Sequence, residues 1–444
     1  MNRPFKIFLA VCLIGAASQT VFAQQSKSRS ITLAEAVQIA TSQNPNVQIA
    51  IINSHLAQQD QKRALSALLP QASVGLGESI QRINVETSLG TTAGLLPLHE
   101  GPFQGLTTGT RFSVPIFNLK NIEHYRAQEA NRLAATVDID TVREQMASLT
   151  VSQYLLSIRM AETVKAVESQ VALAQSLFDQ AQEQEKAGAG TGLDTLRAQQ
   201  RLKVRQQALI VAHEQEQTSR FVLIRFLNLP PTTELVLTDE DSLNSRTIPD
   251  TESASVESAW QQRPEMIALK ARIVAAQRDL ASSRSERWPS LSVDGYWHEE
   301  GNRFDNSIPV YQYQASLSLP VFTGGRINAE IASSNLRIRR LREETQELRN
   351  RIALEVKTAR VKLESALQEV QVADAGLQLA KEEVDQAQTR FHSGVGDNVE
   401  VVTAQDVLAR AYDDEIAALY HVSQSRADLE WAIGRMTATY RRTP

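Results

Sequence analysis

Histidine and cysteine, the side chains that most often perform chemistry in proteins, do not cluster in this sequence. The seven histidines are far apart and lack the spacing of metal ligands. They are His55, His99, His124, His213, His298, His392 and His421. The stretch Gly394-Val395-Gly396 lacks the preceding strand that a nucleotide-binding loop requires. We therefore expect no enzyme activity, no metal site and no cofactor.

Two acidic residues each follow a glycine-rich turn. Asp194 follows the turn at 188–192, and Glu400 follows the turn at 394–398. Thr191 precedes Asp194 by three residues, and Asp397 precedes Glu400 by the same distance, which is the spacing of a helix capping box. One interpretation is that these acids only cap the helices that begin there.

The composition favours long helices and argues against a nucleic-acid partner. The chain is 42% hydrophobic but only 5% aromatic, and its net charge is -5. Globular cores of this size normally contain more aromatic residues. One basic run, residues 337–342, is followed within two helical turns by Glu343, Glu344 and Glu347, which is typical of a solvated helix face.

The N-terminus has the pattern of a secretory signal peptide. Basic residues precede an apolar run at 7–17, and Val21-Phe22-Ala23 predicts cleavage after Ala23. The only cysteine, Cys12, lies inside this signal, so the mature chain is expected to have no disulfide. Val11 is a poor residue before a lipidated cysteine, which argues against a lipid anchor. The sequence after this signal has no stretch of about 18 apolar residues, so no transmembrane helix is predicted.

The elements that position the glycine turns are long helices. In the run 326–391 apolar residues recur at alternating steps of four and three, which is a heptad pattern. The positions are Ile352, Val356, Ala359, Leu363, Ala366, Val370, Ala373, Leu377, Ala380, Val384, Ala387 and Phe391. Such a helix is roughly 100 Å long. A second helix, about 399–433, must fold back along it after the glycine turn.

The same order of elements occurs twice in the chain. Thr32 and Glu35 form a capping box that opens the first helix, and a second helix follows the Asn44-Pro45 break. Each copy then has two stretches of alternating residues, a long helix and a glycine turn. Pro115 and Pro320 close the strand pairs about 205 positions apart, and the turns are about 206 apart. The first long helix repeats the seam at Met160, Val164, Val167, Val171, Ala174, Phe178 and Ala181.

The chain is therefore predicted to be mainly α, with two tandem repeats, each a β-hairpin followed by long antiparallel coiled-coil helices. The expected segments are a signal peptide at 1–23, a first repeat at 24–230, a linker at 231–253, a second repeat at 254–436 and a tail at 437–444. The expected strands lie at about 70–83, 105–117, 289–298 and 310–322.

The strands have the length and alternation of a membrane β-barrel. Each is about ten residues long, with one apolar and one polar or small face. Four strands cannot close a barrel, and open edges are not tolerated in lipid. Two chains would give eight strands around a filled interior, whereas three chains would give twelve strands with room for a lumen. A homotrimer is therefore the smallest assembly expected to form a conduit.

These features together resemble the TolC-like outer-membrane efflux proteins of Gram-negative bacteria. The residues that carry the resemblance are Leu33-Ala34-Glu35-Ala36, Asn44-Pro45, Leu69-Pro70, Trp288-Pro289, Val114-Pro115-Ile116-Phe117 and Leu319-Pro320-Val321-Phe322, with the two glycine turns. The resemblance implies a trimeric twelve-stranded barrel in the outer membrane on an α-helical periplasmic tunnel. It further implies the outlet of a tripartite efflux pump or type I secretion system, with a periplasmic adaptor and an inner-membrane transporter as partners.

The resemblance also suggests roles for the turns. Asp194 and Glu400 match acids that ring the pore at its periplasmic entrance, and three copies would place six carboxylates there. Such a ring would repel anions and favour cations. Thr403, one turn after Glu400, is not acidic, which weakens the ring. The turn glycines that would meet the adaptor are Gly188, Gly190, Gly394 and Gly396.

Aromatic residues lie on or beside the strands and are candidates for interfacial belts. They are Trp288, Trp297, Tyr296, Tyr311, Tyr313, Phe112 and Phe117. The alternative to an outlet is a periplasmic coiled-coil adaptor or structural spacer. An adaptor would show one helical hairpin within a β-rich chain, and this sequence has two long-helix units that each follow a strand pair.

Overall fold

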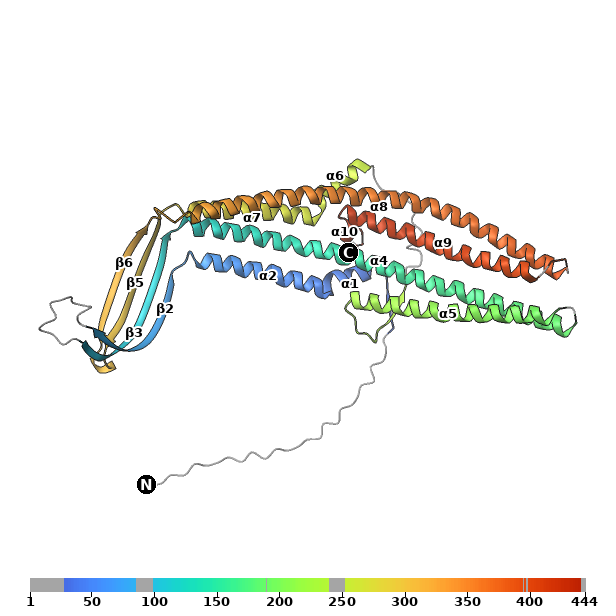
Figure 1. Cartoon of the computed structure of the whole chain (residues 1–444), viewed down its shortest axis with the longest axis horizontal. Helices are drawn as coiled ribbons and strands as arrows, with labels where there is room; N and C mark the ends of the chain where they lie inside the picture. The colour runs from blue at the N-terminus through green and yellow to red at the C-terminus, as the bar shows by residue number, and fades with distance from the viewer. Residues whose placement is uncertain are drawn as a thin grey trace, which may run out of the picture.

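The computed structural model describes residues 28–84, 99–188, 190–238, 252–393, 395–396 and 398–440. The expected signal peptide with Ala23, the turn residue Gly394, most of the expected linker and the last four residues lie outside these ranges. The molecule is elongated, with a four-stranded sheet at one end and two helical tips at the other (Figure 1).

The two repeats are built from elements of nearly equal length. The first contains α1 (Leu33–Gln43), α2 (Pro45–Ser66), β2 (Gln71–Asn84), β3 (His99–Phe117), α4 (Leu119–Lys186) and α5 (Gly192–Phe226). The second contains α6 (Glu252–Gln262), α7 (Pro264–Ser285), β5 (Ser290–Gly301), β6 (Ile308–Ser318), α8 (Arg326–His392) and α9 (Asn398–Ala432), with a 3-10 turn at Phe304–Asn306 between its strands. Helices α1 and α6 have 11 residues each, α2 and α7 have 22, α5 and α9 have 35, and α4 and α8 have 68 and 67.

Local sequence explains where the paired helices begin and break. The capping box predicted at Thr32 and Glu35 is formed, because each residue's side chain accepts a hydrogen bond from the other's backbone N–H. Asn44 and Arg263 precede Pro45 and Pro264, and both are extended, as residues before proline usually are. Each proline therefore separates a short helix from a longer one in the same way.

Several strand boundaries differ from those expected, most of all the end of the last strand and the start of β3. The last strand was expected to reach residue 322, but β6 ends at Ser318. Pro320 has no N–H for a ladder, and Gly324 and Gly325 have positive φ, so the backbone turns into α8 there. Strand β3 begins at His99 rather than 105, because its ladder with β2 continues through a bulge near Gln81.

The start of the expected linker is part of the folded core. Strand β4 (Glu234–Leu237) pairs in parallel with β1 (Ser28–Ile31), and Leu235 is 1% exposed. The hydroxyl of Tyr154, a fully buried residue of α4, donates to the carbonyl of Ile31 at 2.9 Å. Neither strand was predicted from the sequence, since four residues carry too little alternation to detect.

The C-terminal segment packs against the middle of α4. Helix α10 (Met436–Thr439) lies there, and the backbone N–H of Thr437 donates to Glu144 at 3.2 Å. Burial raises the pKa of Glu144, although the hydrogen bonds from Thr437 oppose this shift. The expected tail at 437–444 is thus attached to the first repeat, at least through Tyr440.

The heptad seam of α8 forms the long core of the second repeat. Ten of its twelve predicted positions are buried, and Ala373 and Phe391 are half-buried. In the first repeat Leu177 is buried and the predicted Phe178 is only half-buried. Leu177 packs with Val384 and Ala387 of α8, so this part of α4 faces the other repeat.

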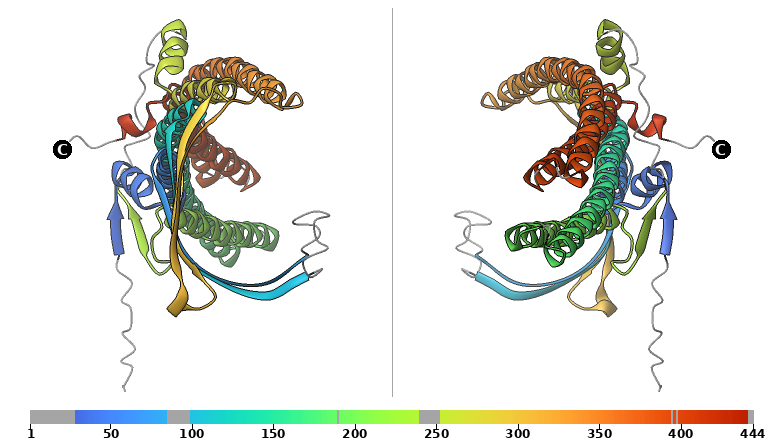
Figure 2. Two further views of the ribbon diagram at one scale, coloured as in Figure 1. Left: turned by 90° about the vertical axis from the view of Figure 1, so that its left-hand side faces the viewer. Right: turned by 90° about the vertical axis from the view of Figure 1, so that its right-hand side faces the viewer.

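The helices form an arc, with α4 in contact with α2, α5, α7 and α9. Viewed along the long axis, they lie side by side in a curved layer, and the strands bend in the same sense (Figure 2). The sheet has the order β2-β3-β5-β6 with antiparallel neighbours, so β3 and β5 join the two hairpins. Strands β2 and β6 are its edges.

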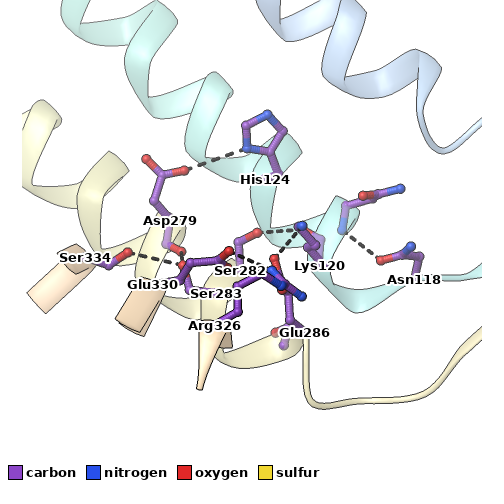
Figure 3. Close-up of polar contacts among 12 residues, drawn as sticks. Asn118, Lys120, His124, Asp279, Ser282, Ser283, Glu286, Arg326, Glu330 and Ser334 are labelled. Carbon is purple, nitrogen blue, oxygen red and sulfur yellow. Dashed lines mark hydrogen bonds and ion pairs between the residues drawn. The ribbon is translucent and has the colours of Figure 1, made fainter. Parts of the chain in front are cut away.

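A carboxylate that is only 7% exposed joins three helices at the end of the molecule where the sheet begins. Glu286, at the end of α7, forms ion pairs with Lys120 of α4 and with Arg326 of α8, the latter at 2.7 Å (Figure 3). Ser282 adds a hydrogen bond to the carbonyl of Lys120 at 3.0 Å. Burial opposes the ionisation of Glu286, but the hydrogen bonds from Lys120 and Arg326 outweigh it and lower its pKa. The ionised form of Glu286 therefore stabilises the fold.

Replacing Glu286 tests this junction. Because the folded-state pKa is lowered, the stabilisation is present above the unfolded pKa of about 4.3 and is lost as the pH falls through the folded value. At pH 7 Glu286→Gln is expected to remove about 1 kcal/mol of stability, because both cations that pair with Glu286 are about half exposed. Thermal unfolding followed by circular dichroism should show a lower midpoint for this variant than for the wild type at neutral pH. Between neutral and acidic pH, the midpoint of the variant should fall less than that of the wild type.

The control is Glu330→Gln, which removes an exposed partner of Arg326 and leaves Glu286 in place. If both variants changed the midpoint and its pH dependence equally, the claim that ionised Glu286 stabilises this junction would be wrong.

Candidate functional site at the helical tips

The first tip connects α4 to α5 through a tight glycine turn. Gly188 has φ +72°, a conformation that favours glycine. The N–H of Gly190 donates to the carbonyl of Gln184 at 3.0 Å, which closes the turn. Thr191 then caps α5.

Asp194 belongs to the capping box of α5. Its carboxylate accepts hydrogen bonds from the N–H and the hydroxyl of Thr191, at 3.3 and 2.6 Å, and its own N–H donates to the Thr191 hydroxyl. Arg197 lies one turn later, 3.9 Å from the carboxylate. The structure thus shows that Asp194 caps α5, and Arg197 is only weakly paired with it.

The second tip repeats the turn but adds an ion pair. The N–H groups of Val395 and Gly396 both donate to the carbonyl of Arg390 at 3.0 Å. A side chain at Gly396 would meet Arg390 at 3.0 Å, which explains the glycine. The guanidinium of Arg390 donates to Glu400 at 3.1 Å across the tip.

The two tips share one closing hydrogen bond, from Gly190 or Gly396 to the residue six positions earlier, but they differ in charge. Gln184 accepts the turn hydrogen bond in the first repeat, at the position that Arg390 holds in the second. Arg390 was not singled out in the sequence. Comparing the two turns residue by residue would have revealed it, because an arginine in one copy aligns with a glutamine in the other. Among the described residues, Thr403 donates its hydroxyl to the carbonyl of Val399 within its own helix.

The sheet has one polar and one apolar face. On the polar face, Ser73, Arg111, Tyr296 and Gln312 lie opposite one another across all four strands, and Tyr296 donates to Gln312 at 3.1 Å. This row lies in a hollow of about 580 Å³. Tyr296 therefore does not belong with the other strand aromatics, to which the sequence analysis assigned it.

The opposite face carries a contiguous aromatic group. Trp297 and Tyr311 are cross-strand neighbours with ring centroids 6.3 Å apart, and Tyr313 lies between Tyr311 and Phe112 at 5.9 and 5.8 Å. Trp297, Tyr311 and Tyr313 are all more than half exposed in the single chain. Such a surface is expected to contact an apolar environment.

None of the helices described is long and apolar enough to cross a membrane. The described side chains include no group of three or more histidine, cysteine, aspartate or glutamate residues that could hold a metal ion.

The duplicated arrangement matches a known family model. The model of the outer membrane efflux protein matches residues 36–229 and 256–435, which are most of both repeats. The chain belongs to the outer membrane efflux protein family. It is accordingly an outer-membrane channel protein with a periplasmic helical domain, and its family consists of transport proteins rather than enzymes.

Individual relatives cover most of the chain at low identity. The pyoverdine export outer membrane protein OpmQ of Pseudomonas putida is 24% identical in an alignment of 422 positions that covers 87% of this chain and 84% of that protein. The CmeC outer membrane channel of Campylobacter jejuni has a TM-score of 0.76 at 17% identity and covers 97% of this chain and 94% of its own. The open state of the MtrE outer membrane channel of Neisseria gonorrhoeae has a TM-score of 0.74 at 16% identity, with 90% and 88% covered.

The capping role at the first tip is testable by hydrogen exchange. Thr191→Ala removes the capping hydroxyl and should cost about 1 kcal/mol locally, so the amides of 192–195 should exchange about fivefold faster. Thr403→Ala is the control, because its hydroxyl bonds only within a formed helix. Unchanged exchange in the Thr191 variant would show that Asp194 and Thr191 do not hold this helix end.

Proposed function

We propose that three copies of this chain form the outlet duct of a tripartite efflux pump or type I secretion system. Four strands from each copy close a twelve-stranded barrel in the outer membrane, and the helices continue it as a periplasmic tunnel. Cargo enters from an inner-membrane transporter through a periplasmic adaptor and moves out passively. The mature chain begins after Ala23.

The observation that carries this proposal is the open sheet. Its apolar aromatic face and its polar face suit lipid on one side and a water-filled lumen on the other. Strands β2 and β6 are left as edges, which lipid does not tolerate. The arc of helices has the form of one section of a tube wall (Figure 2).

The alternative of a periplasmic adaptor or spacer has less support. The family model covers both repeats, and each repeat places a strand pair before its long helix. The names of the relatives include both pyoverdine export and toluene efflux, so cargo differs among them. Cargo choice in this chain is therefore best assigned to the transporter that feeds it.

We further propose that the two tips form the periplasmic entrance. Asp194 and Glu400 lie just past the turns, where three copies would bring six carboxylates together as a gate. The turns contribute the surface that meets the adaptor, through Gly188, Gly190 and Gly396, and through Gly394 outside the described residues. Arg390 reduces the charge of this ring, because it pairs with Glu400.

Planar-bilayer recording tests the duct and its gate. The purified mature trimer should give stepwise, cation-preferring conductance. Asp194→Asn combined with Glu400→Gln should raise the conductance and reduce the cation preference, because the carboxylates no longer repel one another or attract cations. Thr191→Ala, which loosens the cap but keeps both charges, should leave the cation preference unchanged.

Glu183→Gln is the matched control, since Glu183 is a largely exposed acid beside the first tip. Equal currents and equal reversal potentials in the wild type and the double variant would contradict the gate. A folded protein that never conducts, even with both acids replaced, would contradict the duct.

Arg390 provides a test with the opposite sign. Arg390→Gln leaves Glu400 without its partner and so adds one unpaired negative charge per chain at the tip. The reversal potential in a salt gradient should shift toward stronger cation preference. A shift toward anions, or none, would show that Glu400 does not face the ion path.

A further inference from the structure

A partly enclosed cavity lies close to the tips, where helices of both repeats meet. Its volume is about 270 Å³, and helices α4, α5 and α9 line it. Leu173 and Ala174 of α4 and Leu408 of α9 form an apolar part of the wall. The remaining wall includes two arginines, two glutamines, a serine and a tyrosine, so the lining combines apolar and polar side chains.

The described residues that line the cavity include two arginines and no acidic residue. Arg201 and Arg205 of α5 both contact the same oxygen, Oδ1 of Asp406 in α9, and Arg205 does so at 2.8 Å. Their side chains are only about one fifth exposed. Two guanidinium groups thus share one carboxylate. Guanidinium groups can donate five N–H bonds each, so donors remain for a second anion.

The surroundings make this imbalance unfavourable. Burial, then Arg205 and Arg410, lower the pKa of Arg201, and burial also lowers that of Arg205 although Asp413 opposes it. Burial raises the pKa of Asp413, and the positive charges of Arg205 and Arg159 oppose this shift. An additional negative charge next to the two arginines would therefore be stabilised.

An amide group in the cavity wall has no partner among the described residues. Gln405 is 7% exposed, and its Nε2 atom, which carries two N–H donors, makes no hydrogen bond to them. An unpaired buried donor is costly, and a bound acceptor would remove that cost. The amide therefore points to an oxygen-bearing ligand rather than to a purely apolar one.

The last part of the wall is a positioned aromatic ring. Tyr412 of α9 lines the cavity, and the ammonium group of Lys381 lies 5.4 Å from its ring centre. The ring and the leucines offer a surface for a flat apolar body. The arginines and the amide lie in the same cavity and can bind a carboxylate.

We propose that this cavity is a binding site for small carboxylates that carry an aromatic or aliphatic body. Arg201 and Arg205 bind the carboxylate of the ligand while they keep their contacts with Asp406. Gln405 donates a further hydrogen bond to this carboxylate, and the apolar wall contacts the body of the ligand. Because the site joins α5 of one repeat to α9 of the other, an occupant would also contact both repeats. The site is formed within one chain and stands apart from the proposed role of the trimer as a duct.

Equilibrium dialysis of the full mature protein with radiolabelled benzoate tests the site. Benzoate should bind saturably, with one molecule per chain, and unlabelled benzoate should compete while neutral benzamide should not. Arg205→Gln should weaken binding about tenfold or more, because it removes a charge-assisted hydrogen bond. Lys203→Gln, which removes an exposed cation two residues away on the same helix, should leave binding unchanged.

Leu173→Trp is a second variant that narrows the cavity and keeps every charge. It should abolish benzoate binding, and it decides the matter if the arginine variant does not fold. The proposal is wrong if benzoate fails to bind saturably, if benzamide competes equally, or if the lysine variant weakens binding as much as the arginine variant. Full binding by a folded Leu173→Trp protein would also overturn it.

Discussion

The hydrogen-bonding requirement of the two sheet edges governs the architecture of this protein. Strands β2 and β6 each have one side without a partner strand in the described chain. In lipid each unsatisfied backbone N–H or C=O costs several kcal/mol, and a strand of this length has several of them. The chain alone cannot meet this requirement. Under the proposed function, other copies supply the missing neighbours, and the number of copies then sets the width of the lumen.

The duplication places corresponding elements of both repeats at each end of the chain. Equal helix lengths in the two repeats bring both tips to the same end of the molecule, while both hairpins join in one sheet at the other (Figure 1). The ion pairs of Glu286 connect the two repeats, since Lys120 belongs to the first repeat and Arg326 to the second. The repeats have diverged at their charges, as Gln184 and Arg390 show at the tips.

The sequence was most informative where a regular pattern extends over many residues. The seam of α8 was readable from Ile352 to Ala387, because the heptad fixes which residues face the partner helix. The side of the sheet on which each strand residue lies also follows from alternation, although Tyr296 was grouped with residues of the other face. Short elements such as β1 and β4 were missed, because their pairing depends on residues about 200 positions away.

Charged contacts were the least predictable part of the candidate site. The glycine turns and the acids after them were visible in the sequence, and the capping geometry of Asp194 follows from its spacing to Thr191. The sequence did not indicate the partner of Glu400, because Arg390 lies ten residues earlier and meets Glu400 only after the chain has turned. The contact of Arg201 and Arg205 with Asp406 depends on how α5 and α9 pack around α4, which no local pattern specifies.

Disulfide trapping across the sheet edges tests the central claim most directly. The only cysteine, Cys12, lies in the expected signal peptide, so engineered cysteines would be the only thiols of the mature chain. Val74→Cys on β2 can be combined in turn with cysteine at Tyr311, Tyr313 or Ala315 on β6, all on the same face of the sheet. Closure by three copies predicts that mild oxidation of one pairing gives products of two and three chains and none larger. Failure of every pairing to cross-link, or a ladder that continues beyond three chains, would contradict it.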